Sequence, residues 1–426
     1  MNLNSRNSSK PPSYDRNRAK ESKIPTGKKA GGQNGHIGKT LKKVDDPDEI
    51  KEIEADRDLL PPGRYKHVGF ESRQVFDIDL SRVVTEYRAQ VLEDQKGNRY
   101  IASFPEGVAG AVQYGTGVKA QSVYMSQFQM IPYNRVQDYF ADQVFMPVSD
   151  GSIFNFNKEA YELLAGFEER VKTELAASDV LHADETGINM GGKGHWLHLA
   201  SNTSWTYFYP HEKRGMTAMI DMGVLPNFKG ILCHDHWKPY YTLNCTHALC
   251  NAHHLRELAR AFEQDSQQWA QKMKTLLETI NTKVNDAGGV LEVKESDKYR
   301  FEYRALIKEA ELECPLPDIP KKKGKRGRIK RSKSRNLLER LRDFEDDVLR
   351  FMDNKPVPFS NNQGGNDIRM TKVQQKISGC FRSMEGAGIF CRVRSYLSTC
   401  RKHGVKASQA LELLFKGVPR YFMWVT

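Results

Sequence analysis

The sequence predicts an α/β protein, in which a mixed sheet carries a helical insertion and is preceded by a basic arm, a small β-rich unit and a helical region. Two observations support this fold class. Short apolar strands alternate with helices between residues 178 and 262, and helical spacing of apolar residues follows in residues 263–354. The chain of 426 residues is long enough for about two or three domains with cores of their own.

The first 43 residues are expected to form a flexible basic arm. They hold eleven Lys or Arg residues against two acids, and residues 31–36 are too rich in Gly and polar residues for a packed element. A second basic run, residues 321–335, holds ten Lys or Arg residues and no acid. Like charges gathered in this way favour contact with phosphate, and a solvated linker is the alternative.

A small β-rich unit is predicted over residues 44–117, because residues 75–80 and 83–88 partly alternate apolar and polar side chains. Residues 118–177 follow as a helical region, with helices expected over 118–130, 134–143 and 154–175. Short helices joined by tight turns are compatible with a helix-turn-helix DNA reader. A plain helical connector is an equal alternative.

The sheet is predicted between residues 178 and 262. Its first strand ends at Asp184, and a later strand ends at Asp235. The expected elements, in chain order, are strands over 180–183, 195–201 and 203–209, a helix over 215–222, strands over 230–233 and 246–250, and a helix over 252–262. Three antiparallel strands, a helix, a strand, and another strand before a helix are the element order of an RNase H-like fold.

A helical insertion is predicted over residues 263–354, with the second basic run in one of its loops. Residues 337–352 place their apolar side chains at helical spacing. The chain then returns to the sheet domain at residues 355–426, where helices are expected over 386–403 and 407–415. The sheet domain would therefore combine residues 178–262 with residues 355–426.

Asp184 and Asp235 are the candidate catalytic residues. On neighbouring strands their carboxylates can converge on one or two Mg²⁺ ions, which prefer a few carboxylates together with water and phosphate oxygens. Two such metals activate water or a 3′-hydroxyl for attack on a phosphodiester. Spacing alone does not decide this, because an aspartate at a strand end is more often a cap or turn residue.

Several unusual stretches can be compared with a known family. They read HADETG at 182–187, GKGHWL at 192–197, CHDHWKPY at 233–240, CNAHHLREL at 250–258, NNQ at 361–363, DIRM at 367–370 and KISGCFRS at 376–383, with NSSKPPS at 7–13 and GGQNGH at 31–36 in the arm. Together they resemble insertion sequence 66 family transposases through nearly the whole chain. The resemblance implies a DDE-type enzyme with an RNase H-like catalytic domain, which holds divalent metal with Asp, Asp and Glu while it joins transposon ends to target DNA.

The resemblance places Asp184 and Asp235 at the first two metal-binding positions, with Mg²⁺ as the cofactor and Mn²⁺ as a substitute. The third position departs from the family pattern Asn-Asn-x-Ala-Glu-Arg, because Gly365 stands where the glutamate is expected. Asp367 is the nearest fallback acid. Two hypotheses follow: a transposase impaired at Gly365, or a catalytically inactive DNA-binding remnant or regulator of transposition. A stand-alone nuclease of the same fold is a third.

No zinc is expected. Many relatives carry a Cys-bearing zinc segment after the basic arm, but this chain has no cysteine before Cys233. Cys245, Cys250 and the histidines around them look like a zinc cluster, yet their spacing does not match a standard finger. His253 or His254 could instead touch substrate phosphate or pack in the core. Trp237 and Tyr240 could stack on an unpaired base or simply pack.

The expected partner is double-stranded DNA, both the terminal repeats of the insertion sequence and the target, bound by a homo-oligomer. The candidate DNA-binding residues are Lys28, Lys29, Lys238, Lys321, Lys322, Lys323, Lys325, Arg326, Arg328, Arg369, Lys372, Lys376 and Arg382. No apolar run approaches the roughly 18 residues of a membrane span. Dispersed cysteines and the lack of a secretory signal predict a bacterial cytoplasmic, DNA-associated protein.

Overall fold

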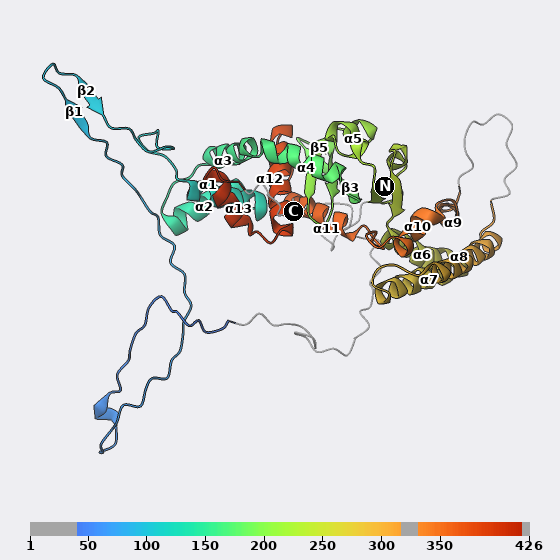
Figure 1. Cartoon of the computed structure of the whole chain (residues 1–426), viewed down its shortest axis with the longest axis horizontal. Helices are drawn as coiled ribbons and strands as arrows, with labels where there is room; N and C mark the ends of the chain where they lie inside the picture. Colours follow the sequence, from blue (N-terminus) through green and yellow to red (C-terminus); the bar gives the residue numbers. More distant parts are fainter. Residues whose placement is uncertain (1–40, 317–330, 420–426) are drawn as a thin grey trace. The chain divides into compact units, whose positions relative to one another are not determined.

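The computed structural model describes residues 41–316 and 331–419. The chain divides into two units, Met1–Val84 and Thr85–Thr426, and each is described by itself. Nearly all of the expected basic arm lies outside the described residues, as does most of the second basic run (Figure 1).

The described part of the first unit, residues 41–84, contains one 3-10 helix, η2 (Arg57–Leu59), and no strand. The strands expected over residues 75–80 and 83–88 do not form, so that prediction is wrong. Val75 and Val83 are 92% and 88% exposed, so the alternating apolar side chains have no surface to cover. A strand pair without a third strand or a packed face is only marginally stable.

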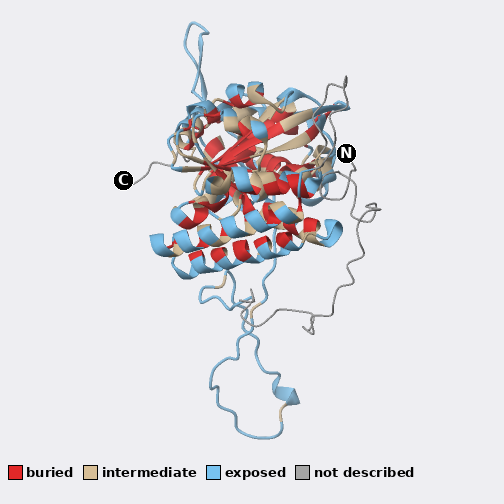
Figure 2. Cartoon of the chain, turned by 90° about the vertical axis from the view of Figure 1, so that its right-hand side faces the viewer, coloured by how far each residue is buried: buried red, intermediate tan, exposed pale blue. Residues whose placement is uncertain are grey.

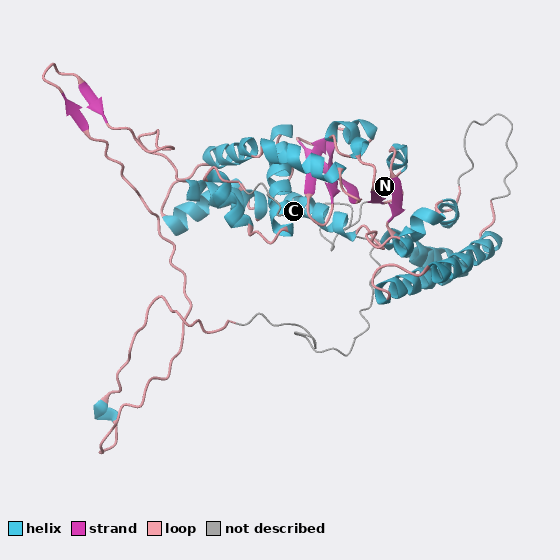
Figure 3. Cartoon of the chain, viewed as in Figure 1, coloured by secondary structure: helices cyan, strands magenta, loops and turns pink. Residues whose placement is uncertain are grey.

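The second unit begins with a hairpin and then turns helical. Strands β1 (Val91–Glu93) and β2 (Arg99–Ile101) pair antiparallel (Figure 3). The helical region comprises α1 (Thr116–Val123), the π-helical turn η3 (Tyr124–Phe128), α2 (Tyr133–Val144), α3 (Asp150–Leu163) and α4 (Ala165–Ala176). The single helix expected over residues 154–175 is therefore two helices, which separate at the fully buried Leu164. A DNA-reading role for this region stays a prediction.

A five-stranded mixed sheet lies at the centre of the second unit (Figure 3). Its strands are β3 (Val180–Met190), β4 (Lys193–Ser201), β5 (Thr206–His211), β6 (Ile231–His234) and β7 (Thr246–Leu249). The order across the sheet is β5-β4-β3-β6-β7. Strands β3, β4 and β5 are antiparallel neighbours, whereas β6 runs parallel to both β3 and β7.

Strand β3 is longer than expected, and Asp184 lies inside it rather than at its end. The strand was expected over residues 180–183, but residues 184–187 continue the antiparallel ladder with β4, in which Asp184 pairs with Leu199. The parallel pairing with β6 stops earlier, at His182 and Cys233. Asp184 therefore lies just past the point where pairing with β6 ends.

The two faces of β3 pack against different helices, because successive side chains point to opposite faces. Leu181 and Ala183 belong to the largest core, which also contains apolar residues of α1 to α4, α12 (Met384–Lys402) and α13 (Ala407–Phe415). Ile188 and Met190 face the other way, toward Ile368 of α11 (Asn362–Ser378). Figure 2 shows buried residues gathered along the sheet.

The edge strand β5 is covered by α12. The backbone amides of Thr206 and Phe208 donate hydrogen bonds to the hydroxyls of Thr399 and Ser395, at 3.1 Å and 2.9 Å. An edge strand whose amides are already paired presents less of a template to another chain. The C-terminal helices expected over 386–403 and 407–415 are thus confirmed as α12 and α13.

The helical insertion follows α6 (Asn251–Asp265) and has its own core. It comprises α7 (Gln268–Asp286), α8 (Val293–Glu313), α9 (Lys333–Asp343) and α10 (Glu345–Asp353). Their inner faces are buried together with Cys233 and Leu249 of the sheet (Figure 2). The helix expected over residues 337–352 breaks at Phe344, where α9 ends and α10 begins. None of the helices in the described ranges is long and apolar enough to span a membrane.

Candidate active site

Asp184 and Asp235 come from neighbouring parallel strands. His182 and Cys233 are the last paired residues of β3 and β6, and Asp184 and Asp235 each follow them by two positions. The two aspartates are close enough for the charge of Asp235 to act on Asp184. Alternate residues of a strand share a face, so Asp184 lies on the same side of the sheet as His182 and Ile188. This is the side on which α11 packs against β3.

The pair is electrostatically unfavourable without a cation. Burial, together with the negative charges of Glu185 and Asp235, raises the pKa of Asp184 to about 7. A hydrogen bond from the backbone amide of Glu185 and the positive charge of Arg214 oppose this only in part. A divalent cation between the carboxylates would relieve the cost, because an opposite charge favours the ionised form.

Asn361 fixes the start of α11 next to Asp184. Its side-chain amide donates to the carbonyl oxygen of Ala183 at 2.8 Å, and its Oδ1 is 2.7 Å from Nδ1 of His182. Its backbone amide donates to Sγ of Cys250 at 3.1 Å. The first turn of α11 is therefore held against the strand that carries Asp184.

Gly365 lies in that first turn, at a position with room for a side chain. Its backbone amide donates to the carbonyl oxygen of Asn361 at 3.1 Å, and an added Cβ would meet no atom within 4 Å. Lys372 lies seven residues farther, about two turns along the same side of the helix. Its Nζ donates to the carbonyl oxygen of Gly187 on β3 at 2.9 Å, so this side of α11 faces the strand.

Asp367, the fallback acid, is engaged elsewhere. Its Oδ2 pairs with Nζ of Lys402 at 2.8 Å, and Lys402 also donates to the carbonyl oxygens of Asn202 and Trp205. A step of two residues along a helix turns a side chain by about 200°. The geometry therefore does not favour Asp367 as a replacement for the acid missing at Gly365.

Glu185 forms a second buried cluster on the opposite face of β3. Its Oε1 accepts from Nε and Nη2 of Arg214 at 2.9 Å and 2.5 Å, and its Oε2 accepts from the Tyr240 hydroxyl at 2.5 Å. The ring of Tyr240 is buried. Of the two alternatives for this residue, stacking on an unpaired base and packing, the structure therefore supports packing. Trp237 packs against Arg214, whose guanidinium is 4.3 Å from the ring centroid.

Sequence reasoning gave no role to Glu185 or Arg214. The available signal was a second acidic residue directly after Asp184, because a buried charge requires a partner. The partner could not be identified, since Arg214 is 29 residues away in the chain.

A cavity of about 220 Å³ opens next to Asp235. Residues from the loop after β6, from the start of α6 and from α9 line it: Asp235, His236, Trp237, Cys250, His253, His254, Glu257 and Arg340. Burial lowers the pKa of His253, so its imidazole is neutral near pH 7. In the part of the chain that the structure describes, no three His, Cys, Asp or Glu side chains are grouped to hold a metal ion.

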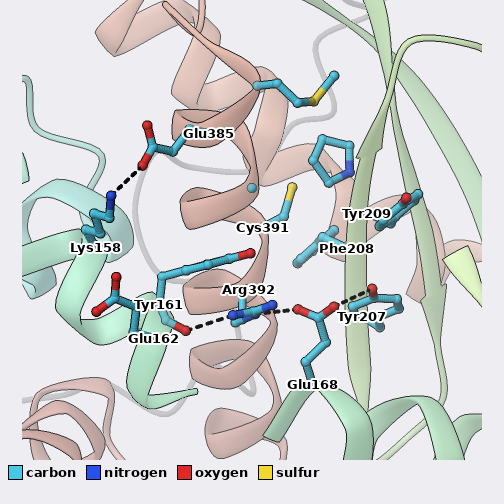
Figure 4. A pocket seen from close by; sticks show the side chains of 13 residues that line it. Lys158, Tyr161, Glu162, Glu168, Tyr207, Phe208, Tyr209, Glu385, Cys391 and Arg392 are labelled. Carbon is cyan, nitrogen blue, oxygen red and sulfur yellow. Dashed lines mark hydrogen bonds and ion pairs between the residues drawn. The ribbon is translucent and has the colours of Figure 1, made fainter. Parts of the chain in front are cut away.

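A larger cavity, of about 350 Å³, contains neither aspartate (Figure 4). It lies among α3, α4, β5 and α12, and four of its charged groups form two ion pairs. Lys158 pairs with Glu385 at 3.0 Å, and Arg392 bonds both Glu168 and the carbonyl oxygen of Tyr161. Because these charges are already satisfied, we place the candidate active site at the aspartates.

The candidate DNA-binding residues fall into three groups. Lys238, Arg369, Lys376 and Arg382 are exposed. Lys372 is not, because it is half-buried and bonded to β3. The remaining candidates, Lys28, Lys29, Lys321, Lys322, Lys323, Lys325, Arg326 and Arg328, lie outside the described residues.

Comparison with known proteins identifies one family. The family model described as "Transposase IS66 family" matches residues 111–389, well over half of the chain. The match includes the helical region, the whole sheet, the insertion and α11. No curated protein matches the chain.

Proposed function

Because the chain belongs to the IS66 family of transposases, we propose that it binds insertion-sequence ends and carries a metal centre for DNA cleavage and strand transfer. The observation that supports this best is the register of β3 and β6, because Asp184 and Asp235 each follow the last paired residues, His182 and Cys233, by two positions. Two carboxylates on one side of neighbouring strands are the donors that Mg²⁺ prefers.

We infer that the sheet is of the RNase H-like kind. In the order β5-β4-β3-β6-β7, three antiparallel strands are followed by two strands parallel to the first of them. This agrees with the element order that the sequence predicts. A DDE-type centre on such a sheet would use the side of β3 on which α11 lies.

Asp184 and Asp235 would hold Mg²⁺, or Mn²⁺ in its place. The donor set fits such an ion only in part, because two carboxylates are present and position 365 supplies none. When bound, the metal activates water or a 3′-hydroxyl and stabilises the leaving oxygen. The protein's own contribution would be to supply the two carboxylates from β3 and from the segment after β6, with Asp184 in surroundings that disfavour its ionised form.

Gly365 supports a second proposal, that this copy is impaired in catalysis while it keeps its fold and its DNA binding. Asp367 is paired with Lys402, and a Cβ added at Gly365 would meet no atom within 4 Å. If catalysis is lost completely, the protein is a catalytically inactive DNA-binding regulator of transposition. DNA would be held by the exposed cations Lys238, Arg369, Lys376 and Arg382 together with the two basic runs, and the DNA-bound form would be a homo-oligomer.

Calorimetric titration with Mn²⁺ tests the metal centre without requiring turnover. We expect the unmodified protein to bind Mn²⁺, and Asp184→Asn and Asp235→Asn each to bind it at least about tenfold more weakly. Asp221→Asn is the matched control, because Asp221 is an aspartate of α5 whose carboxylate contacts His211. Equal binding by all four proteins would overturn the proposed centre.

A further inference from the structure

We propose that Glu185 is a positioning residue, which fixes the loop carrying Asp235 against the strand carrying Asp184. The inference rests on the proposed function, because it concerns the geometry of the same two aspartates. The segment from Asp235 to Thr242 is called the Asp235 loop below. The buried Glu185 carboxylate is linked to this loop twice, once directly and once through Arg214.

The first contact is direct. The Glu185 side chain is only 2% exposed, and its Oε2 accepts a hydrogen bond from the Tyr240 hydroxyl at 2.5 Å. Tyr240 belongs to the 3-10 helix η5 (Lys238–Thr242), which begins three residues after Asp235. The bond therefore ties the backbone next to Asp184 to the segment that follows Asp235.

The second contact passes through Arg214. Glu185 Oε1 accepts two hydrogen bonds from the guanidinium, which is 4.7 Å from the ring centroid of Trp196 and 4.3 Å from that of Trp237. A guanidinium over an indole ring is attracted by the negative face of the ring. Glu185 thus aligns Arg214 between a tryptophan of β4 and a tryptophan of the Asp235 loop.

Trp237 is joined to Asp235 itself. Its backbone amide donates to Oδ1 of Asp235 at 3.0 Å, and its ring meets that of Tyr240 edge to face at 5.4 Å. Both contacts of Glu185 therefore end within five residues of Asp235. Groups that orient metal ligands from behind in this way commonly contribute about 10- to 100-fold to metal affinity.

Glu185 is not itself placed as a third metal ligand. It follows Asp184 in an extended strand, so its side chain points to the opposite face of the sheet. Both of its oxygens already accept hydrogen bonds from Arg214 and Tyr240. This distinction is testable, because removing Arg214 has opposite effects in the two cases.

The test compares Mn²⁺ affinity among Glu185→Gln, Tyr240→Phe and Arg214→Gln by calorimetry on the full chain. We expect Glu185→Gln to weaken binding about tenfold or more, and each partner variant to reproduce part of that loss. If Glu185 were a ligand, Arg214→Gln would leave affinity unchanged or raise it, because it removes a competing cation. That result would overturn the inference.

Glu168→Gln is the matched control, because Glu168 forms the same constellation elsewhere. Its carboxylate bonds Arg392, which lies 3.6 Å from the ring centroid of Tyr161, and accepts from the Tyr207 hydroxyl at 3.1 Å (Figure 4). We expect Glu168→Gln to lower thermal stability as Glu185→Gln does, without changing Mn²⁺ affinity. Equal losses of affinity in both variants would reduce Glu185 to a structural role and overturn the inference.

Indole N–H signals in ¹⁵N NMR spectra provide a readout that needs no metal. We expect Glu185→Gln to shift the signals of Trp196 and Trp237 and to leave that of Trp269, in the insertion, unchanged. An unshifted Trp237 signal would contradict the positioning role even if Asp184→Asn abolishes Mn²⁺ binding. If Asp184→Asn leaves Mn²⁺ binding intact while Trp237 shifts, the proposed metal centre fails instead.

Discussion

At the scale of single residues, the candidate site is marked by Asp184, whose carboxyl group is unfavourable to ionise in its surroundings. Asp184 follows the buried Ala183 in β3, and burial together with the charges of Glu185 and Asp235 makes its carboxyl group costly to ionise. A protein that only needed a stable sheet would place an apolar residue there, because buried unpaired charge is unfavourable. A cation bound at this point would compensate for the unfavourable free energy of ionising Asp184.

The raised pKa of Asp184 predicts how the stability of the metal-free protein depends on pH. Between pH 4 and pH 7 the folded state binds more protons at Asp184 than the unfolded state, whose pKa is near 3.8. The free energy of unfolding therefore falls as pH rises through this window, and the loss is complete above pH 7. Asp184→Asn should remove this dependence.

Denaturant unfolding at pH 4.5 and pH 8, in the presence of a chelator, measures this difference. At pH 8 we expect Asp184→Asn to be more stable than the unmodified protein by on the order of 1–3 kcal/mol, and near pH 4.5 to differ little. A variant that is less stable at pH 8 would show that the Asp184 carboxylate is stabilised by groups other than a metal.

From the sequence alone, Asp184 and Asp235 can be proposed as metal ligands, but the residues that contact them cannot. Asp184 and Asp235 stand beside short apolar runs and inside stretches that resemble the family, so both kinds of signal agreed. Arg214 and Tyr240 reach Glu185 across 29 and 55 residues. Such contacts depend on the packing of the whole sheet, which no local pattern reports.

At the scale of elements, the position of α11 determines which side chains face β3, the strand that carries Asp184. It is fixed at its start by Asn361, along its length by Lys372, and on its other side by the pair of Asp367 and Lys402. Lys402 is largely buried and also bonds two carbonyl oxygens of the turn between β4 and β5. This helix is therefore held in place from both sides despite Gly364 and Gly365.

Lys402→Met tests that anchoring. It leaves the Asp367 carboxylate and two carbonyl oxygens without their donor, so we expect a loss of on the order of 2 kcal/mol in the free energy of unfolding. Lys406→Met is the control, because Lys406 is exposed and should change stability by less than about 0.5 kcal/mol. Equal stability of the two variants in chemical denaturation would show that α11 does not depend on this pair.

Helices and strands were predicted correctly where the local sequence contains both an apolar run and the turns that bound it. The predictions were wrong where contacts with distant parts of the chain determine the structure. Helix α13 was predicted with its correct ends, and β6 within one residue, because short apolar runs there are bounded by clear turns. Residues 75–88 partly alternate as strands do, but the structure assigns no strand to them. Strand β3 continues through residues 184–187, beyond the end expected from the sequence, because β4 pairs with them.

At the scale of the whole molecule, positive charge gathers in two runs, and part of the second is structural. Arg335 is buried at the start of α9, where its guanidinium donates to the carbonyl oxygen of Cys314 at 2.8 Å. Ser332 caps the same helix. A deletion through residue 335 would therefore damage the insertion, and a test of DNA binding has to stop before residue 331.

Replacing Lys321, Lys322, Lys323, Lys325, Arg326 and Arg328 with serine tests the run without touching α9. Each phosphate contact contributes about 0.9 to the slope of log affinity against log salt. We expect the slope to flatten by up to about 5, with similar weakening on terminal-repeat and unrelated DNA. An unchanged slope in fluorescence anisotropy titrations would identify the run as a solvated linker.

The most direct test of the account is strand transfer with cognate insertion-sequence ends in Mg²⁺ or Mn²⁺, comparing the unmodified chain with Gly365→Glu. The account predicts that the unmodified chain transfers strands slowly or not at all. Gly365→Glu should be faster by at least about a hundredfold, since several kcal/mol of transition-state stabilisation correspond to such factors. DNA affinity should not change, and Asp184→Asn added to Gly365→Glu should abolish the gain. Full activity of the unmodified chain, abolished by Asp367→Ala, would contradict the account.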